Sequence, residues 1–164
     1  MNNNNAVRIE AAPMATEEVR LLIGELDAVL SAEYTPEQQH GLALDAIFQP
    51  HVRFFLARLD GAAVGCVGVA LFSDFAEVKR MYVRDPARGQ GVADAMLARI
   101  EEEVRDAGLS LLRLETGDRQ VAAMRFYARA GFQLCPAFGA YALMAPQSIA
   151  TSVFFEKRIG LPAA

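Results

Sequence analysis

A glycine-bearing turn between a predicted strand and a predicted helix is the part of this sequence best suited to bind a ligand. The turn covers residues 88–93 and contains Gly89 and Gly91. Glycines let the backbone bend tightly and remove side chains that would block a ligand. The N–H groups of the turn and of the first helical turn lack partners, and with the helix dipole they favour an anion such as a pyrophosphate. Arg88 adds a positive charge beside them.

Three other interpretations of this turn compete with the pyrophosphate site. The P-loop pattern fails because no Gly-Lys-Ser or Gly-Lys-Thr ends the turn. The dinucleotide-binding fingerprint fails because its sixth position, counted from Gly89, is Asp94 rather than Gly or Ala. The third interpretation is a tight strand-to-helix connection that binds nothing, and the glycine pair alone leaves it open.

Histidine, cysteine and serine residues form no recognisable metal site or nucleophile in the sequence. His40 and His51 lack a Cys, Asp or Glu at ligand spacing, and we expect both on the surface or in loops. Cys66 and Cys135 have no C-x-x-C spacing, and we expect both to be reduced and buried. Ser152 has no histidine or acid placed for a catalytic triad. The sequence therefore predicts no metal.

Strands and helices alternate around the turn in an order that predicts a mixed sheet. Asp60 and Gly61 separate two strand-forming runs and indicate a hairpin. Thr16 is a predicted N-cap, and Thr35 with Gln38 forms a predicted capping box. The predicted strands cover residues 7–11, 52–59, 63–71, 75–83, 111–115 and 153–158, with one more before the last; the predicted helices cover 16–30, 35–48, 91–107 and 121–130. The fold class is therefore α/β (α+β), with helices on both faces of the sheet and the order β-α-α-β-β-β-α-β-α-β-β.

Length and composition indicate a single domain. The 164 residues, 53% of them hydrophobic and 22% charged, suffice for one core. We expect residues 1–6 to form a disordered N-terminal tail and residues 7–164 to form the domain. No apolar run reaches the length of a membrane span and no export signal is recognisable, so we expect a cytoplasmic protein without a membrane partner. A net charge of −4 argues against nucleic acid, while exposed strand edges and the apolar residues 153–155 are compatible with a homodimer.

The sequence resembles the GNAT superfamily of N-acetyltransferases. The family signature Arg/Gln-x-x-Gly-x-Gly/Ala is matched by Arg88, Gly91 and Ala93, and the segments 77–83 and 123–132 occur in the family's order and spacing. The resemblance extends from residue 7 to residue 158. The segments 138–141 and 152–157 are similar to a bacterial subgroup of small-molecule acetyltransferases. This resemblance implies a splayed sheet whose cleft takes acetyl-CoA.

The resemblance also implies which residues bind the acetyl donor. The strand before the turn would carry a bulge and would bind the pantetheine arm through its backbone. Gln120 stands where the family often has an asparagine that contacts CoA, and its longer side chain puts that contact in doubt. The implied donor-binding residues are Met81, Tyr82 and Val83 on the strand, Arg88, Gly89, Gln90, Gly91, Val92 and Ala93 at the turn, and Gln120.

Two catalytic residues follow from the same resemblance. Tyr127 matches the family's tyrosine general acid, which would protonate the departing thiolate. Glu77 stands where many members place a glutamate base, and it would act through water. The alternatives are an aromatic that packs in the core for Tyr127, and an exposed or ion-paired strand-end residue for Glu77. Strict alternation would place Glu77, Lys79, Met81 and Val83 on one face of their strand and Val78, Arg80 and Tyr82 on the other.

The predicted function is acetyl transfer from acetyl-CoA to the primary amine of a small molecule, by direct attack in a ternary complex. Acetyl-CoA is then the donor substrate and the partner is a small-molecule amine. The alternatives are a catalytically weak CoA-binding or sensor domain and a protein N-acetyltransferase on the same fold. A helical segment over residues 16–48 could form a lid over a small pocket or pack as a helix pair on the sheet. Glu115 and Ser152 lie at strand positions that could face the cleft, where Glu115 could also be a structural hydrogen-bonding group.

Overall fold

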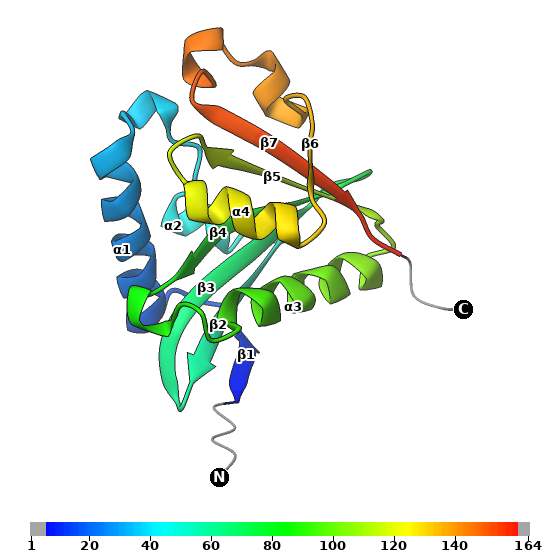
Figure 1. The fold of residues 1–164 in the computed structure, drawn as a ribbon. Coiled ribbons are helices and arrows are strands. Elements are labelled where there is room, and N and C mark those ends of the chain that lie inside the picture. The colour runs from blue at the N-terminus through cyan, green and yellow to red at the C-terminus, as the bar shows by residue number, and fades with distance from the viewer. Residues whose placement is uncertain (1–5, 161–164) are drawn as a thin grey trace.

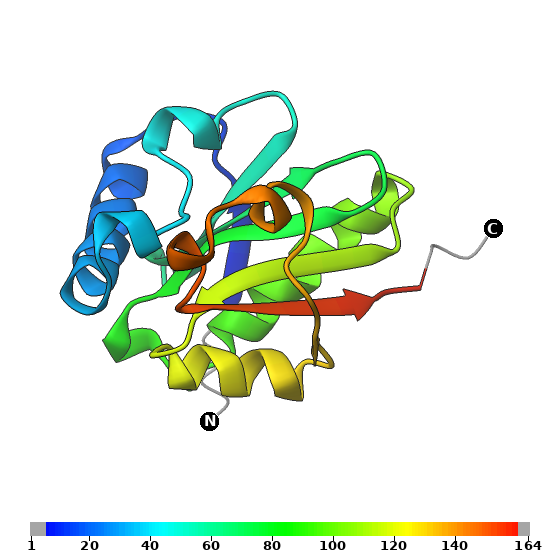
Figure 2. The same ribbon diagram turned by 90° about the horizontal axis from the view of Figure 1, so that it is seen from above.

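A seven-stranded sheet runs through the protein and has helices on both faces (Figures 1 and 2). The computed structural model describes residues 6–160, so the predicted tail lies outside the described residues except for Ala6. The strand order is β1-β2-β3-β4-β5-β7-β6. The strands are β1 (Val7–Ala11), β2 (Val52–Leu59), β3 (Ala62–Leu71), β4 (Ala76–Val83), β5 (Leu111–Gly117), β6 (Gln133–Leu134) and β7 (Ser152–Arg158). The predicted mixed sheet and its element order are confirmed.

Four α-helices connect these strands. Helix α1 (Glu17–Glu33) begins at Thr16, whose hydroxyl accepts a hydrogen bond from the Val19 N–H at 3.3 Å, as the sequence predicts. The others are α2 (Leu44–Ile47), α3 (Val92–Asp106) and α4 (Val121–Arg129). Within the described residues no helix is both long and apolar enough to cross a membrane.

Each face of the sheet has its own hydrophobic core. Helices α3 and α4 cover one face, where Val67, Met96 and Leu112 are fully buried. Helix α1 packs on the other face through Val19 and Leu22. The stretch predicted to be the second helix is broken, because only residues 36–38 form a 3₁₀ turn and α2 begins at Leu44. The predicted capping box of that 3₁₀ turn is present.

The segment that interrupts the predicted second helix runs close to β4 at His40 and Gly41. Lys79 Nζ donates a 3.1 Å hydrogen bond to the backbone carbonyl of His40, which holds this segment extended over the sheet. A Cβ built on Gly41 would come within 2.0 Å of the Arg80 guanidinium. The chain therefore passes close over Arg80 at Gly41, where any side chain would require the guanidinium to move.

Strands β4 and β5 separate soon after they meet, which opens the sheet in its middle (Figure 1). They are parallel and pair only at Ala76 with Leu112 and at Glu77 with Arg113. On its other side β4 stays paired with β3 up to Val83. The second half of β4 therefore has one edge without a strand partner in the described structure, as the predicted splayed sheet requires.

A β-bulge at Arg80 reverses the faces of β4. The pairing with β3 shifts there, and Arg80 has a φ of 54°. Before the bulge Val78 packs in the core under α3 and α4; after it Met81 packs in that core and Tyr82 packs against the α1 side. The strict alternation expected from the sequence is therefore wrong beyond Lys79, because the extra residue moves every later side chain to the opposite face.

Candidate functional site

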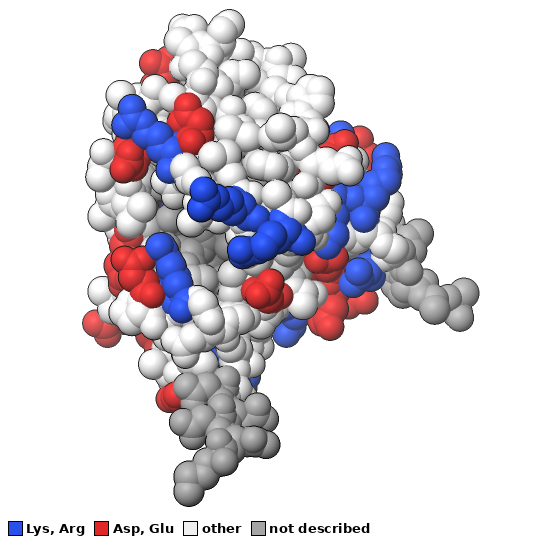
Figure 3. Space-filling view, in the orientation of Figure 1, with Lys and Arg blue, Asp and Glu red and all other residues white. Residues whose placement is uncertain are grey.

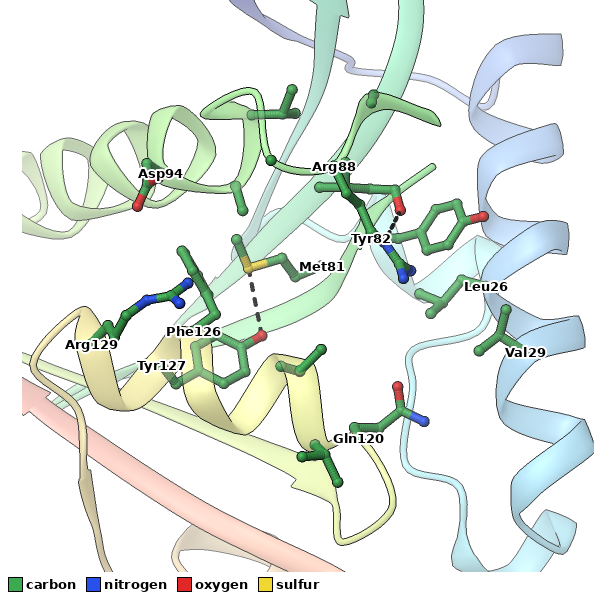
Figure 4. A pocket seen from close by; sticks show the side chains of 18 of the residues that line it. Leu26, Val29, Met81, Tyr82, Arg88, Asp94, Gln120, Phe126, Tyr127 and Arg129 are labelled. Atoms are coloured by element: carbon green, nitrogen blue, oxygen red, sulfur yellow. Dashed lines mark hydrogen bonds between the residues drawn. The ribbon is translucent and has the colours of Figure 1, made fainter. Parts of the chain in front are cut away.

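A cavity of about 580 Å³ lies where β4 and β5 diverge, between helix α1, the start of α3 and helix α4 (Figure 4). We call it the larger cavity. Leu26 and Val29 of α1 form one wall, and Phe126 of α4 lies on the opposite side. Of the predicted donor-binding residues, the cavity is lined by Met81, Tyr82, Val83, Arg88, Gly89, Gly91, Val92, Ala93 and Gln120. Gln90 does not line the cavity; its side chain donates a hydrogen bond to the Pro86 carbonyl at 3.1 Å.

The turn before α3 presents a row of unused backbone donors to this cavity. No N–H group from Gly89 to Asp94 donates to a protein acceptor within residues 6–160. Gly91 is the N-cap of α3, with a φ of 82° and no side-chain cap, and Gly89 has a φ of 75°. A Cβ at either glycine would touch no protein atom, so the positive φ angles are what demand glycine here. Unpaired N–H groups at a helix N-terminus suit the pyrophosphate predicted from the sequence.

Arginines surround the mouth of the larger cavity (Figures 3 and 4). Arg88 pairs with Asp85 at 2.7 Å and donates to the Val83 carbonyl at 3.2 Å. Arg119 and Arg129 also line the cavity, and Arg129 has no ion pair among the described residues. Sequence reasoning missed both, because they lie just before and within α4, far along the chain from the glycine turn. These cations suit a ligand with several phosphates.

Tyr127 lies at the inner end of the larger cavity. It is 7% exposed, and its hydroxyl donates to the Met81 sulfur at 3.5 Å (Figure 4). Burial raises the pKa of Tyr127 above the ordinary value of a phenol, and the nearby Glu115 carboxylate raises it further. The hydroxyl therefore keeps its proton at neutral pH and is available as a hydrogen-bond donor.

A smaller cavity of about 120 Å³ adjoins the larger one and shares Tyr127 with it. The segment that follows α1 forms its outer wall with Tyr34, whose hydroxyl accepts a 2.8 Å hydrogen bond from the Arg119 N–H. A Cβ on Gly117 would lie 2.1 Å from this hydroxyl, so the ring lies flush on the end of β5. Residues shared by both cavities are Leu26, Met81, Gln120, Ala123 and Tyr127.

Glu115 of β5 lines the smaller cavity with Tyr127. Ser152 Oγ donates to Glu115 Oε2 at 2.6 Å. Desolvation raises the pKa of Glu115, although the Ser152 hydrogen bond and the charges of His40 and Lys79 work in the opposite direction. A carboxyl with a raised pKa accepts protons more readily than an exposed one, so this residue can exchange a proton with a ligand in the smaller cavity.

Glu77 lies beside the smaller cavity and lines neither cavity. It is 6% exposed; Tyr141 donates to its Oε2 at 2.7 Å and Lys79 donates to the same atom at 3.2 Å. Lys79 does line the smaller cavity, so Glu77 is connected to the cavity only through its hydrogen bond with Lys79. The structure therefore brings Tyr127 and the glycine turn together at the cavities and holds Glu77 in a buried polar cluster. Its role as a base stays a prediction.

The histidines and cysteines lie in different surroundings from one another. His40 Nε2 is 2.8 Å from the Ser148 carbonyl, and His40 lines the smaller cavity. Cys66 is buried, which raises the pKa of its thiol to about 12, whereas Cys135 is only partly buried. The expectation that both thiols are buried is therefore correct only for Cys66. Across residues 6–160 no three His, Cys, Asp or Glu side chains come together as a metal site.

Comparison with known proteins agrees with this geometry. The model of the acetyltransferase (GNAT) family matches residues 22–132. The chain is 41% identical over 138 residues to an IAA acetyltransferase of Azospirillum brasilense, which covers 83% of this chain and 87% of that one. It is 32% identical over 93 residues to an aminoalkylphosphonate N-acetyltransferase of Salmonella typhimurium, covering 53% and 60% of the two chains.

One solved structure matches the fold of this chain over almost its full length. It is a presumed acyl-CoA N-acyltransferase from Klebsiella pneumoniae, with a TM-score of 0.75 and 31% identity. The match covers 96% of this chain and all of that one. Similarity of sequence and similarity of fold therefore point to the same family.

Proposed function

The chain belongs to the GNAT acetyltransferase family and is an acyltransferase, and we propose that it moves an acetyl group from acetyl-CoA to the primary amine of a small molecule. The larger cavity receives acetyl-CoA and the smaller cavity receives the amine. The position of Tyr127, which lines both cavities, carries this proposal, because the acid that protonates the thiolate must lie at the thioester, where the acetyl-CoA and the amine meet.

The residues of the larger cavity have distinct tasks in this proposal. The N–H groups of residues 89–94 and the arginines at the mouth bind the phosphates of the donor. The unpaired edge of β4 at residues 81–83 binds the pantetheine arm through backbone hydrogen bonds. A backbone N–H near Met81 would then polarise the thioester carbonyl, the stabilisation that acyl transfer needs.

Transfer proceeds by direct attack within a ternary complex. The amine nitrogen bonds to the acetyl carbon, the C–S bond breaks, and the thiolate takes a proton through the Tyr127 hydroxyl. The proton lost by the nitrogen balances the one gained by the sulfur. Because the pKa of Tyr127 is raised, the phenol is neutral and can donate a hydrogen bond to the forming thiolate. It gives up its own proton to the sulfur only as it takes the proton that the nitrogen loses.

The size of the smaller cavity favours a small-molecule acceptor over a protein. A volume of about 120 Å³, closed on one side by Tyr34 and the segment after α1, suits a small amine better than a peptide. The expectations of a cytoplasmic location, a homodimer and a single domain over residues 7–164 stay predictions.

Two measurements test the proposed function. Acetyl-CoA should raise the melting temperature, because a ligand that binds only the folded state stabilises it, by about 2.7 kcal/mol at a concentration of 100 times its Kd. Release of free thiol from acetyl-CoA should then depend on an added amine, tested over a panel of alkyl amines, amino acids and polyamines. Absence of the thermal shift would refute the assigned donor; a shift without amine-dependent thiol release would favour a sensor domain.

A further inference from the structure

The cations that line the smaller cavity are already neutralised by carboxylates. Lys79 pairs with Glu77 at 3.2 Å, and the buried guanidinium of Arg80 pairs with Asp27 of α1. Neither carboxylate partner lines the cavity. The smaller cavity therefore has little net positive charge to attract an anion. The charge of Glu115 then determines whether the cavity attracts a cation.

Glu115 is the acid of this cavity that has no cationic partner. No Lys, Arg or His nitrogen in the described part of the chain lies within ion-pair distance of its carboxylate. Ser152 donates its hydrogen bond to Oε2. The other oxygen, Oε1, has no hydrogen bond and is not fully buried. Oε1 is thus accessible to a small ligand.

The charged and titratable groups that interact with Glu115 come from four parts of the chain. His40 precedes Gly41 in the segment after α1, Lys79 and Glu77 come from β4, and Tyr127 comes from α4. The fourth is the 3₁₀ helix Gly139–Leu143, which carries Tyr141. Lys79 and His40 favour the ionised carboxylate, whereas Glu77 and desolvation favour the protonated acid. The carboxylate therefore lies in a setting where it can both hold a cation and take up a proton.

We propose that Glu115 binds the protonated acceptor amine and accepts the proton that it must lose before attack, so that the acceptor is a small cation. This inference rests on the proposed function. Ser152 is a positioning residue, because it fixes Oε2 and leaves Oε1 for the ammonium. Glu115 and Tyr127 both line the smaller cavity, so the proton acceptor and the proton donor share one site.

The proton balance of this step is complete. The ammonium gives one proton to the Glu115 carboxylate and becomes a free amine. The amine nitrogen bonds to the acetyl carbon as the C–S bond breaks, and its second proton reaches the thiolate through Tyr127. Glu115 then returns its proton to water, and the products are the N-acetylated amine and the free thiol.

The test compares Glu115→Gln with the parent protein on the best alkyl amine of the panel and on an arylamine, which is already a free base at neutral pH. With the alkyl amine, kcat/KM at neutral pH should fall about 100-fold or more, the usual contribution of a general base. The deficit should shrink as pH approaches the amine's own pKa, and it should be much smaller with the arylamine. The thermal shift with acetyl-CoA should not change.

Two further variants keep the inference falsifiable. Ser152→Ala removes a hydrogen bond that lowers the pKa of Glu115, so the acid limb of the kcat/KM profile should move to higher pH. Glu156→Gln removes a carboxylate of β7 that pairs with Arg113 and lines neither cavity, so its kinetics should match the parent. A deficit of Glu115→Gln that is equal at every pH and for both amines would overturn the inference and leave the proposed function standing. A parent protein without amine-dependent thiol release would overturn both.

Discussion

Tyr141 donates a 2.7 Å hydrogen bond to Glu77 in a cluster that also includes Lys79, and this cluster decides what a change at Glu77 can do. We expect Glu77→Gln to lower the free energy of unfolding by about 1–3 kcal/mol, because it removes the charge that the Tyr141 hydroxyl and the Lys79 ammonium share. Thermal or urea unfolding measures this loss. The kinetic effect should follow from a displaced Lys79 and should not recover at high pH.

The pH profile of Glu77→Gln separates this expectation from the base role predicted from the sequence. A loss of kcat that is largest at low pH and recovers towards the amine's pKa would support the base role. A salt-sensitive rise in KM alone would indicate that Glu77 attracts a cationic substrate. Tyr141→Phe is the matched comparison, because it removes a donor from the cluster and leaves the Glu77 charge in place.

The sequence predicts the scaffold well because its signals are local. The Asp60 and Gly61 turn, the Thr16 cap and the periodicity of α3 each depend on neighbouring residues, and each is present in the structure. The family resemblance implies a bulge in this strand, but no local signal places it at Arg80, because its position depends on how β3 and β4 pair. Its effect on the faces of β4 therefore required the structure.

The residues of the candidate site also fall into those that local motifs predict and those that only the structure brings together. The glycine turn and Tyr127 belong to motifs with fixed spacing, and they reach the cavities as expected. Tyr34 and Arg119 come from separate parts of the chain and meet because Tyr34, just after α1, lies against the end of β5. No spacing rule connects such residues, so sequence reasoning could not assign them to one wall.

Gly91 should be essential for donor binding and replaceable for folding. Leucine at this position must adopt a φ near 82°, which costs about 1–2 kcal/mol, and its side chain would crowd the exposed N–H groups. We expect Gly91→Leu to fold with a lowered melting temperature and to lose the stabilisation by acetyl-CoA. Gly108→Leu is the matched control, because Gly108 also has a positive φ of 76° and open space but lies beyond the far end of α3. An intact acetyl-CoA shift in Gly91→Leu would contradict the assigned role of the turn.

A side chain at Gly41 should displace the Arg80 guanidinium, since its Cβ would collide with that group. We expect Gly41→Ala to displace the segment that covers the smaller cavity and to raise KM for the amine more than KM for acetyl-CoA. Gly24→Ala in α1 is the control, because that position has open space and a helical alanine should raise stability by about 0.5–1 kcal/mol. Equal effects of Gly41→Ala on both KM values would argue against a local change at the smaller cavity.

The raised pKa of Glu115 makes its ionisation unfavourable for folding. A folded-state pKa above the unfolded value means that the folded protein holds the proton more tightly, so stability is lost as pH rises through the folded pKa. Glu115→Gln mimics the neutral acid and should therefore melt at a higher temperature than the parent at neutral pH. The difference should close as pH falls below about 4.3, the ordinary pKa of glutamate, because both states are then protonated. A difference that stays constant over this range would come from packing.

Tyr127 should contribute to the transition state and little to donor binding. Tyr127→Phe keeps the ring, which packs against Phe132 and Phe155, and removes only the hydroxyl that meets the Met81 sulfur. Because that hydrogen bond is a weak one to sulfur, we expect melting temperature and the acetyl-CoA shift to stay close to those of the parent. The hydrogen bond to the departing thiolate exists only as the C–S bond breaks, so its loss should lower kcat with KM for acetyl-CoA almost unchanged. A loss of about 100-fold or more is expected for a positioned proton donor. Unchanged turnover on the best amine would make Tyr127 a packing residue and would require another donor among the residues shared by the two cavities.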